Sequence, residues 1–142
     1  MEMIPTMGIL TLTLLAFSVA GLGKIIIEYA KSNKILWHMA FTTGGMPSSH
    51  SATVSALTTS IFLHEGITSV FFISLFFSLV VMTDAIGVRL QTGMQGEALN
   101  KMMKRRKERY HFNERVGHTP TQVIAGATLG ILMALSGALL LF

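Results

Sequence analysis

A serine-rich stretch between a glycine break and an apolar run carries the first residues that can do chemistry. It reads GGMPSSHSAT over residues 44–53. Pro47 suits the first turn of a helix, where a missing N–H costs nothing, and the neighbouring serines place hydroxyls beside unpaired backbone N–H groups. Such a helix start binds anions, and His50 exchanges a proton near neutral pH. The stretch predicts an anion site with a proton donor; the plainer alternative is a serine-capped helix with an incidental histidine.

A second stretch repeats this arrangement before the last apolar segment. It reads ERVGHTPTQV over residues 114–123, so glycine, histidine and proline again precede a hydrophobic helix. His118 is expected at the mouth of that helix, with Glu114 before it and Gln122 just inside it. Two imidazoles at two helix starts, with cations and acids near the ends of the other apolar segments, suit the binding of a phosphate.

Charged residues near the ends of the other apolar segments complete the candidate site. Lys24 follows the first uncharged run, and Asp84 and Arg89 flank the end of the third. Simpler interpretations are a lysine anchored at the membrane boundary and a structural salt bridge between Asp84 and Arg89. A metal site built from His50, His118 and Asp84 is a further alternative.

The composition indicates a membrane protein. Of 142 residues, 51% are hydrophobic, 13% are charged and none is cysteine, and the mean hydropathy is +0.58. This balance is typical of membrane domains, and the lack of cysteine excludes disulfides and thiolate metal sites. We predict one domain over residues 1–142, an all-α bundle of four transmembrane helices. The expected spans are about residues 4–23, 48–64, 67–87 and 121–142.

Small residues in two of these segments predict close helix packing. The second span is rich in serine, threonine and alanine, which favours burial among other helices over exposure to lipid. In the last span, Gly126 and Gly130 form a G-x-x-x-G pair that lets another helix approach closely. That helix belongs either to the same chain or to a second copy, so a homo-oligomer through Gly126 and Gly130 is one expectation.

The basic residues predict the orientation in the membrane. All 11 Lys and Arg lie in the first and third connections between the expected spans. With four crossings these connections share one side, which the positive-inside rule makes cytoplasmic. We therefore expect a multi-pass protein of the inner (plasma) membrane, with the candidate site on the cytoplasmic face and both termini opposite. Residues 90–110 are expected to form a basic amphipathic helix on the anionic lipid surface, and no nucleic-acid-binding pattern is present.

Taken in order, these residues resemble the divergent branch of the type-2 phosphatidic acid phosphatase and vanadium haloperoxidase superfamily. The matching strings are GGMPSSHSA, DAIGVR, Leu99-Asn100 and GHTPTQV, and with the four apolar segments they cover nearly the whole chain. Typical members of the superfamily carry a lysine–arginine motif, a Pro-Ser-Gly-His motif, and a third motif with Arg, His and Asp. The resemblance implies a membrane phosphatase.

The resemblance also implies roles for individual residues. His50 matches the general acid, and His118 matches the nucleophile that attacks phosphorus. Lys24 matches the lysine of the first motif. Ser48 and Ser49 are expected to bind phosphate oxygens, although Ser49 stands where the typical motif has glycine.

Two further positions depart from the typical third motif. Phe112 stands where that motif has arginine, so Arg89 is expected to supply this charge from another helix. Gln122 stands where an aspartate orients the nucleophile. Because glutamine accepts an imidazole N–H bond but cannot stabilise imidazolium, Glu114 or Asp84 is expected to do so.

The implied reaction is hydrolysis of a lipid phosphate through a phosphohistidine intermediate, and it needs neither a metal nor a cofactor. Phosphatidylglycerophosphate, phosphatidate and a prenyl phosphate or pyrophosphate all fit a substrate made on the cytoplasmic leaflet. The alternative is a non-catalytic membrane protein that binds lipid phosphates or serves in assembly. A transporter subunit fits less well, because four short spans offer no obvious inverted repeat.

Overall fold

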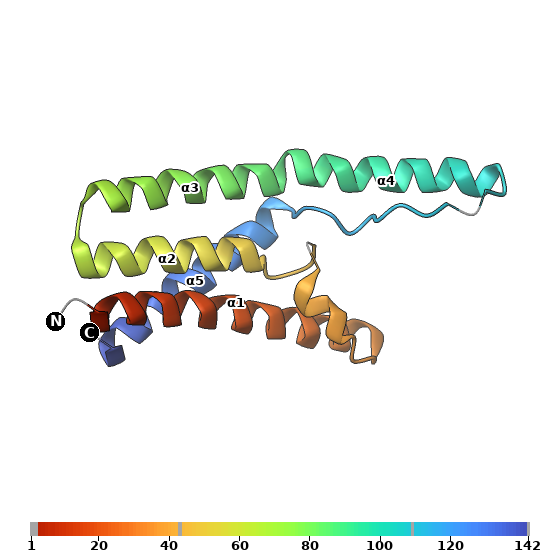
Figure 1. Ribbon diagram of the computed structural model, residues 1–142. Helices are drawn as coiled ribbons and strands as arrows, with labels where there is room; N and C mark the ends of the chain where they lie inside the picture. The colour runs from red at the N-terminus through yellow and green to blue at the C-terminus, as the bar shows by residue number, and fades with distance from the viewer. Residues whose placement is uncertain (1–2, 43, 109, 142) are drawn as a thin grey trace.

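The computed structural model describes residues 3–42, 44–108 and 110–141, and these residues contain helices and connections but no strand. Figure 1 shows the helices packed together in a bundle, with the cyan helix projecting beyond the others. The elements are α1 (Met3–Ser32), the 3₁₀ helix η1 (Trp37–Phe41), α2 (Ser49–Glu65), α3 (Ser69–Ile86), α4 (Val88–Arg105) and α5 (Pro120–Leu141). The expected all-α class is confirmed. The ends of the expected domain (residues 1–2 and 142) and residue 109 of the expected basic segment lie outside the described residues.

Helix α2 lies at the centre of the bundle, in contact with α1, α3 and α5. Its buried positions are mostly serine, alanine and threonine, and Ala52 and Ala56 are completely shielded from solvent. Small side chains allow neighbouring backbones to approach closely, and hydroxyls can bond across helices. One such bond joins Thr58 of α2 to Ser78 of α3 at 2.8 Å. The sheltered position expected for this segment is confirmed.

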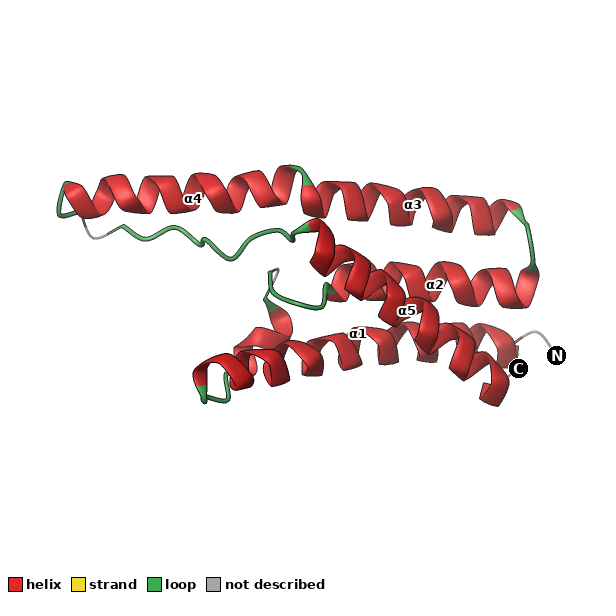
Figure 2. Cartoon of the chain, turned by 180° about the vertical axis from the view of Figure 1, so that it is seen from behind, coloured by secondary structure: helices red, strands yellow, loops and turns green. Residues whose placement is uncertain are grey.

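The two glycines of the G-x-x-x-G pair bring α5 against α2 within the chain. A Cβ at Gly126 would lie 2.3 Å from the carbonyl oxygen of Ser48, and one at Gly130 would lie 2.1 Å from that of Ala52. Figure 2 shows α5 running obliquely across α2 towards α1. Because both glycines are in backbone contact with α2, the structure gives no support to a homo-oligomer through this pair.

Three helical stretches among the described residues are long and apolar enough to cross a membrane. They are Thr6–Ser32, Ser69–Arg105 and Pro120–Leu139. Helix α2 has only 17 residues and is rich in hydroxyl groups, so it lacks the length and composition of a lipid-exposed span. Three of the four expected spans therefore lie in helices whose length and apolar composition suffice for crossing a membrane.

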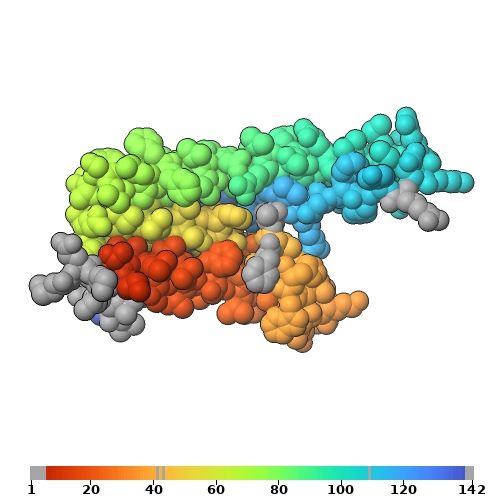
Figure 3. All heavy atoms as spheres, viewed as in Figure 1, coloured from red at the N-terminus to blue at the C-terminus, as the bar shows by residue number. Residues whose placement is uncertain are grey.

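Helix α4 continues nearly in line with α3 and projects past the end of α2 (Figure 3). The hydrogen-bond ladder carries on through Gly87, whose N–H donates to Thr83 at 2.9 Å and whose carbonyl accepts from Gln91 at 3.0 Å. A helix does form within residues 90–110, but it extends the axis of α3. Its expected position along the membrane surface is not confirmed.

Candidate active site

His50 and His118 meet at the end of the bundle from which α4 projects. Their ring centroids are 6.4 Å apart and the ring planes are tilted by 59°. His50 lies in the first turn of α2, directly after the capping region, whereas His118 lies just before α5 begins. A backbone hydrogen bond of 3.1 Å, from the N–H of Ser48 to the carbonyl of Gln122, joins the two helix starts. Two stretches far apart in sequence thus bring their imidazoles into one site.

Three contacts hold His118. Its backbone N–H donates to the carbonyl of Ala85 at 3.0 Å. Its Nδ1 lies 3.1 Å from the carbonyl oxygen of Gly45 and 3.2 Å from Oε1 of Gln122. The same Oε1 accepts the backbone N–H of Thr119 at 3.1 Å, which fixes the amide with its oxygen towards the ring. The whole residue is only 1% exposed.

These contacts assign the hydrogen of the neutral His118 ring to Nδ1. The Gly45 carbonyl can only accept a hydrogen bond, so Nδ1 must donate. In a neutral imidazole the lone pair then lies on Nε2. That atom is buried and has no hydrogen-bond partner among the described residues. An unpaired buried nitrogen is unusual in a folded protein.

Burial also keeps the His118 ring neutral. It lowers the pKa of His118 below the ordinary value of 6.5, because the charged imidazolium loses its hydration. The hydrogen bond to Gln122 opposes this shift, and the positive charge of Lys24 adds to it. At pH 7 the ring is therefore neutral, with a lone pair on Nε2.

Lys24 reaches the same site from α1. It is 1% exposed, and its Nζ donates to the carbonyl of Thr42 at 2.7 Å and to Oγ of Ser49 at 3.2 Å. Ser48, unlike Ser49, does not contact Lys24 among the described residues. Its hydroxyl caps α2 by accepting the backbone N–H of Ser51 at 3.3 Å and the Ser51 hydroxyl at 2.9 Å. Of the two serines expected to bind phosphate, Ser49 is thus the one beside the cation.

Asp84 and Arg89 form an ion pair across the junction of α3 and α4, with Nε of Arg89 donating to Oδ2 of Asp84. The salt bridge given above as the simpler interpretation of Asp84 and Arg89 is therefore present. Both side chains are about a third exposed. Their charges, together with that of Lys24, act on the His50 ring, so the pair borders the site.

Glu114 lies away from the histidine ring. Its Oε1 accepts a hydrogen bond of 2.7 Å from Nδ2 of Asn100 on α4. Within the described part of the chain, neither Glu114 nor Asp84 contacts a ring nitrogen of His118. The expected carboxylate beside His118 is not found, because the extended chain before it turns Glu114 towards α4. The neutral Gln122 and the Gly45 carbonyl occupy that place.

The sequence did not predict the backbone acceptors of the site. The carbonyls of Thr42, Gly45 and Ala85 hold Lys24 and His118, yet a carbonyl has no residue type by which to recognise it. Gly45 has φ +91, a conformation that favours glycine. The double glycine was therefore the one signal that this loop turns its backbone unusually.

The alternative of a metal site is not supported by the side chains present. Among the described residues, no group of three or more His, Cys, Asp or Glu side chains is arranged to hold a metal ion. Asp84, the carboxylate of that alternative, is instead paired with Arg89.

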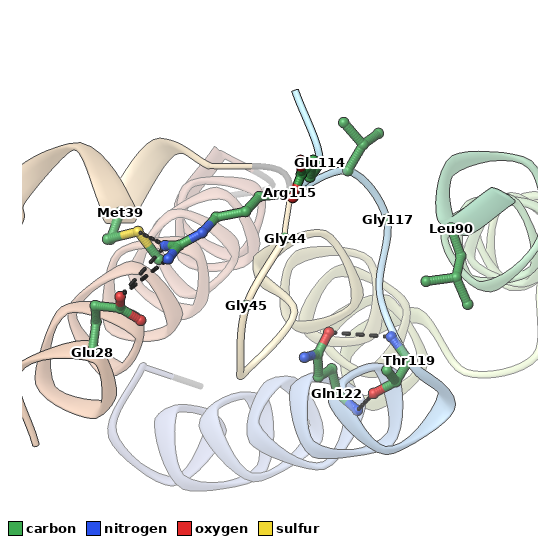
Figure 4. A pocket seen from close by; sticks show the side chains of 11 residues that line it. Glu28, Met39, Gly44, Gly45, Leu90, Glu114, Arg115, Gly117, Thr119 and Gln122 are labelled. Carbon is green, nitrogen blue, oxygen red and sulfur yellow. Dashed lines mark hydrogen bonds and ion pairs between the residues drawn. The ribbon is translucent and has the colours of Figure 1, made fainter. Parts of the chain in front are cut away.

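A cleft of about 240 Å³ lies beside the residues that orient His118. Figure 4 shows Gln122 and Thr119 on one side of it, and Arg115 reaching towards Glu28 on the other. Arg115 Nη2 lies 3.4 Å from Oε1 of Glu28. The residues lining this cleft include Gly45 and Gln122 but neither His50 nor His118. It therefore opens towards the partners of Nδ1 and not onto Nε2.

Comparison with known proteins places this geometry in a family. A family model described as "Divergent PAP2 family" matches residues 6–133, which include both histidine-bearing helix starts. The chain is 34% identical over 152 residues to "Uncharacterized membrane protein YuiD" of Bacillus subtilis (strain 168), covering 95% of this chain and 96% of that protein. No solved structure matches the chain. The protein therefore belongs to the Divergent PAP2 family.

Proposed function

We propose that this protein is a membrane phosphatase that hydrolyses a lipid phosphate through a phosphohistidine formed on His118. The observation that carries the proposal is the buried Nε2, whose lone pair is fixed by the Nδ1 contact to Gly45 and which lacks a partner among the described residues. Buried polar atoms are normally paired. An unpaired imidazole nitrogen next to a buried lysine and a second histidine suits attack on an anionic electrophile.

The reaction has two steps. In the first, Nε2 of His118 attacks phosphorus, and the bond from phosphorus to the lipid oxygen breaks as the bond to nitrogen forms. Protonated His50 gives its proton to the leaving oxygen, a contribution of roughly 10²–10⁴-fold. In the second step water attacks phosphorus and the bond to nitrogen breaks. His50 takes the proton of the water, so both imidazoles return to their starting states.

The negative charge on the transferring group needs fixed donors. Lys24 and Ser49 are already side by side, and the first-turn N–H groups of α2 point out of the same helix start. These groups stabilise the equatorial oxygens of the transition state. Arg89 adds a second cation when its ion pair with Asp84 opens, and Asp84 then stabilises the imidazolium of His50.

The proposal includes a membrane topology and a substrate class. Helix α2 crosses as a fourth span in the shelter of α1, α3 and α5, within a single domain. The basic residues in the two connections at the α4 end make that end cytoplasmic, with both termini on the opposite side of the plasma membrane. The site then meets lipid phosphates of the cytoplasmic leaflet, such as phosphatidylglycerophosphate, phosphatidate or a prenyl phosphate.

Two observations favour a second candidate, a protein that binds lipid phosphates without turning them over. Gln122 carries no charge to stabilise an imidazolium. In addition, Lys24 and His118 are both 1% exposed, so a phosphate reaches them only after the surrounding loops move. A binding protein needs neither imidazolium stabilisation nor rapid exchange at Nε2.

A phosphate-release assay combined with trapping of the intermediate tests the proposal. Purified protein in detergent is given a panel of lipid phosphates in the presence of EDTA, and quenched samples are analysed for acid-labile phosphate on histidine. We expect release of inorganic phosphate and an adduct on His118. His118→Ala should lose both, whereas the matched variant of exposed His38 should keep both. Lipid phosphate binding without release supports the second candidate, and a panel with neither binding nor release contradicts both.

A further inference from the structure

The chain before His118 forms an extended strap, defined as residues 110–118, which runs back along α4 (Figures 1 and 2). Its outer end is paired with one side chain. Oδ1 of Asn100 accepts the backbone N–H of Phe112 at 2.7 Å, and Nδ2 of Asn100 donates to the Phe112 carbonyl at 2.9 Å. Nδ2 also donates to Glu114 at 2.7 Å. Asn100 thus holds both backbone groups of one strap residue.

The strap packs against a face of α4 that has no side chains at two of its positions. A Cβ at Gly93 would lie 2.5 Å from the carbonyl oxygen of Val116, and one at Gly96 would lie 2.9 Å from that of Asn113. Positions three and seven residues apart share one face of a helix. Gly93, Gly96 and Asn100 therefore form one face, on which two glycines admit the strap and the asparagine fixes it.

The strap has little slack between the attachments at its two ends, and between them Arg115 is also paired with Glu28 of α1. Its inner end is fixed where the N–H of His118 donates to Ala85 at 3.0 Å. The helical path from Ala85 to Asn100 is about 22 Å at 1.5 Å per residue. From Phe112 to His118 the chain reaches at most about 20–22 Å when fully extended. Because these lengths are nearly equal, a shift at the Asn100 end is passed along the strap to His118.

We propose that Asn100 is a positioning residue for His118, which holds the outer end of the strap and thereby fixes the direction of Nε2. The catalytic meaning of this inference rests on the proposed function, but the positioning itself does not. Asn100 makes no described contact with the ring, so it acts only through the strap. These hydrogen bonds give a structural role to Asn100 of the Leu99-Asn100 string, which takes no part in the proposed reaction.

The position of Asn100 allows this role to be separated from folding. Among the described residues, helix α4 packs mainly against α3 and the strap, and it has no extensive contacts with α1, α2 or α5. The side chain of Asn100 is partly exposed. Its removal should therefore leave the bundle intact while freeing the outer end of the strap.

The first test measures how accessible the His118 ring is, without any substrate. The full-length protein in detergent is treated with diethyl pyrocarbonate, and carbethoxylation of His118 is followed by peptide mass spectrometry. In the wild type we expect strong protection, since the ring is buried. Asn100→Ala should raise the labelling rate at His118 at least fivefold, and Gln95→Ala, an exposed position on the same helix, should leave it unchanged. Gly93→Ala, whose Cβ displaces the strap, should act like Asn100→Ala.

The second test measures kinetics on the lipid phosphate that the wild type hydrolyses best. Displacing a nucleophile by about 1 Å costs up to roughly 10²-fold in rate, so we expect kcat of Asn100→Ala to fall at least tenfold with KM within twofold. Asn100→Asp keeps the acceptor for the Phe112 N–H but loses both donated hydrogen bonds. Its kcat should therefore lie between that of the wild type and that of Asn100→Ala. Circular dichroism confirms that each variant is folded.

The outcomes separate this inference from the proposed function. Unchanged labelling of His118 in both Asn100→Ala and Gly93→Ala overturns the positioning role, whatever the phosphatase assay shows. A wild type that releases no phosphate overturns the proposed function, while the labelling experiment still decides the role of Asn100. Increased labelling together with an unchanged kcat contradicts the link between strap and chemistry.

Discussion

The two helix starts that carry the histidines look alike in sequence but hold their rings in different ways. At the start of α2, Ser48 caps the helix and His50 sits inside the first turn, partly exposed. At the start of α5, His118 lies outside the helix and is buried against Gly45 and Gln122. A ring on a helix turn keeps some freedom, whereas a ring fixed at Nδ1 and by its own backbone has one orientation.

This difference matches two different chemical roles. A nucleophile needs a lone pair aimed at one point before the substrate arrives. A general acid must reach the leaving oxygen and afterwards exchange its proton with water. The position of each histidine relative to the first residue of its helix therefore supports the proposed division of roles more strongly than the surrounding motif does.

The largest effect is expected from replacing the fixed histidine. His118→Ala removes the only proposed acceptor of the phosphoryl group, so we expect turnover to fall by about 10³-fold or more. Because the adduct cannot form, the loss should be the same for a lipid phosphate and for nitrophenyl phosphate, whose leaving group is much better. Initial rates with both substrates measure this. Activity above a tenth of the wild-type value with either substrate would assign the nucleophile elsewhere.

The next largest effect should depend on the leaving group. His50→Ala removes the proton donor, which we expect to slow release from an alkyl lipid phosphate by about 10²–10⁴-fold. Nitrophenolate leaves without a proton, so the same variant should lose less than about tenfold on nitrophenyl phosphate. Equal losses on both substrates would contradict the division of roles between the two rings.

Local signals in the sequence predicted the parts of this comparison that depend on side chains. Hydropathy and turn residues located the apolar helices and both histidine-bearing starts, and the resemblance to the superfamily placed Gln122 beside His118. The carbonyls of Gly45 and Ala85 could not be predicted, because their positions depend on how distant segments pack. The expected position of residues 90–110 on the membrane surface is not confirmed, because hydrogen bonds on both sides of Gly87 continue the helix of α3 into α4.

A smaller effect is expected from restoring a carboxylate beside the fixed ring. Gln122→Glu places a negative charge near Nδ1 of His118, which favours imidazolium and raises the pKa of that histidine. More of the ring is then protonated at neutral pH, so the acid limb of the pH–rate profile should move to higher pH. At pH 6 we expect a rate loss of about tenfold, recovered at pH 8. The matched change to leucine should slow turnover at every pH, because it releases the ring without adding charge.

The smallest expected effect is on stability. Burial lowers the pKa of His118 in the folded state below its value near 6.5 in the unfolded chain, so the unfolded chain binds the proton first as the pH falls. The stabilising contribution of the neutral ring is therefore complete above about pH 6.5, and is lost as the pH falls through the folded pKa. Thermal unfolding between pH 7.5 and pH 5 should show this decline. His118→Gln should flatten it and His38→Gln should not. If the decline persists in His118→Gln, another group makes the folded state sensitive to acid. The His118 ring would then be less constrained than its contacts indicate.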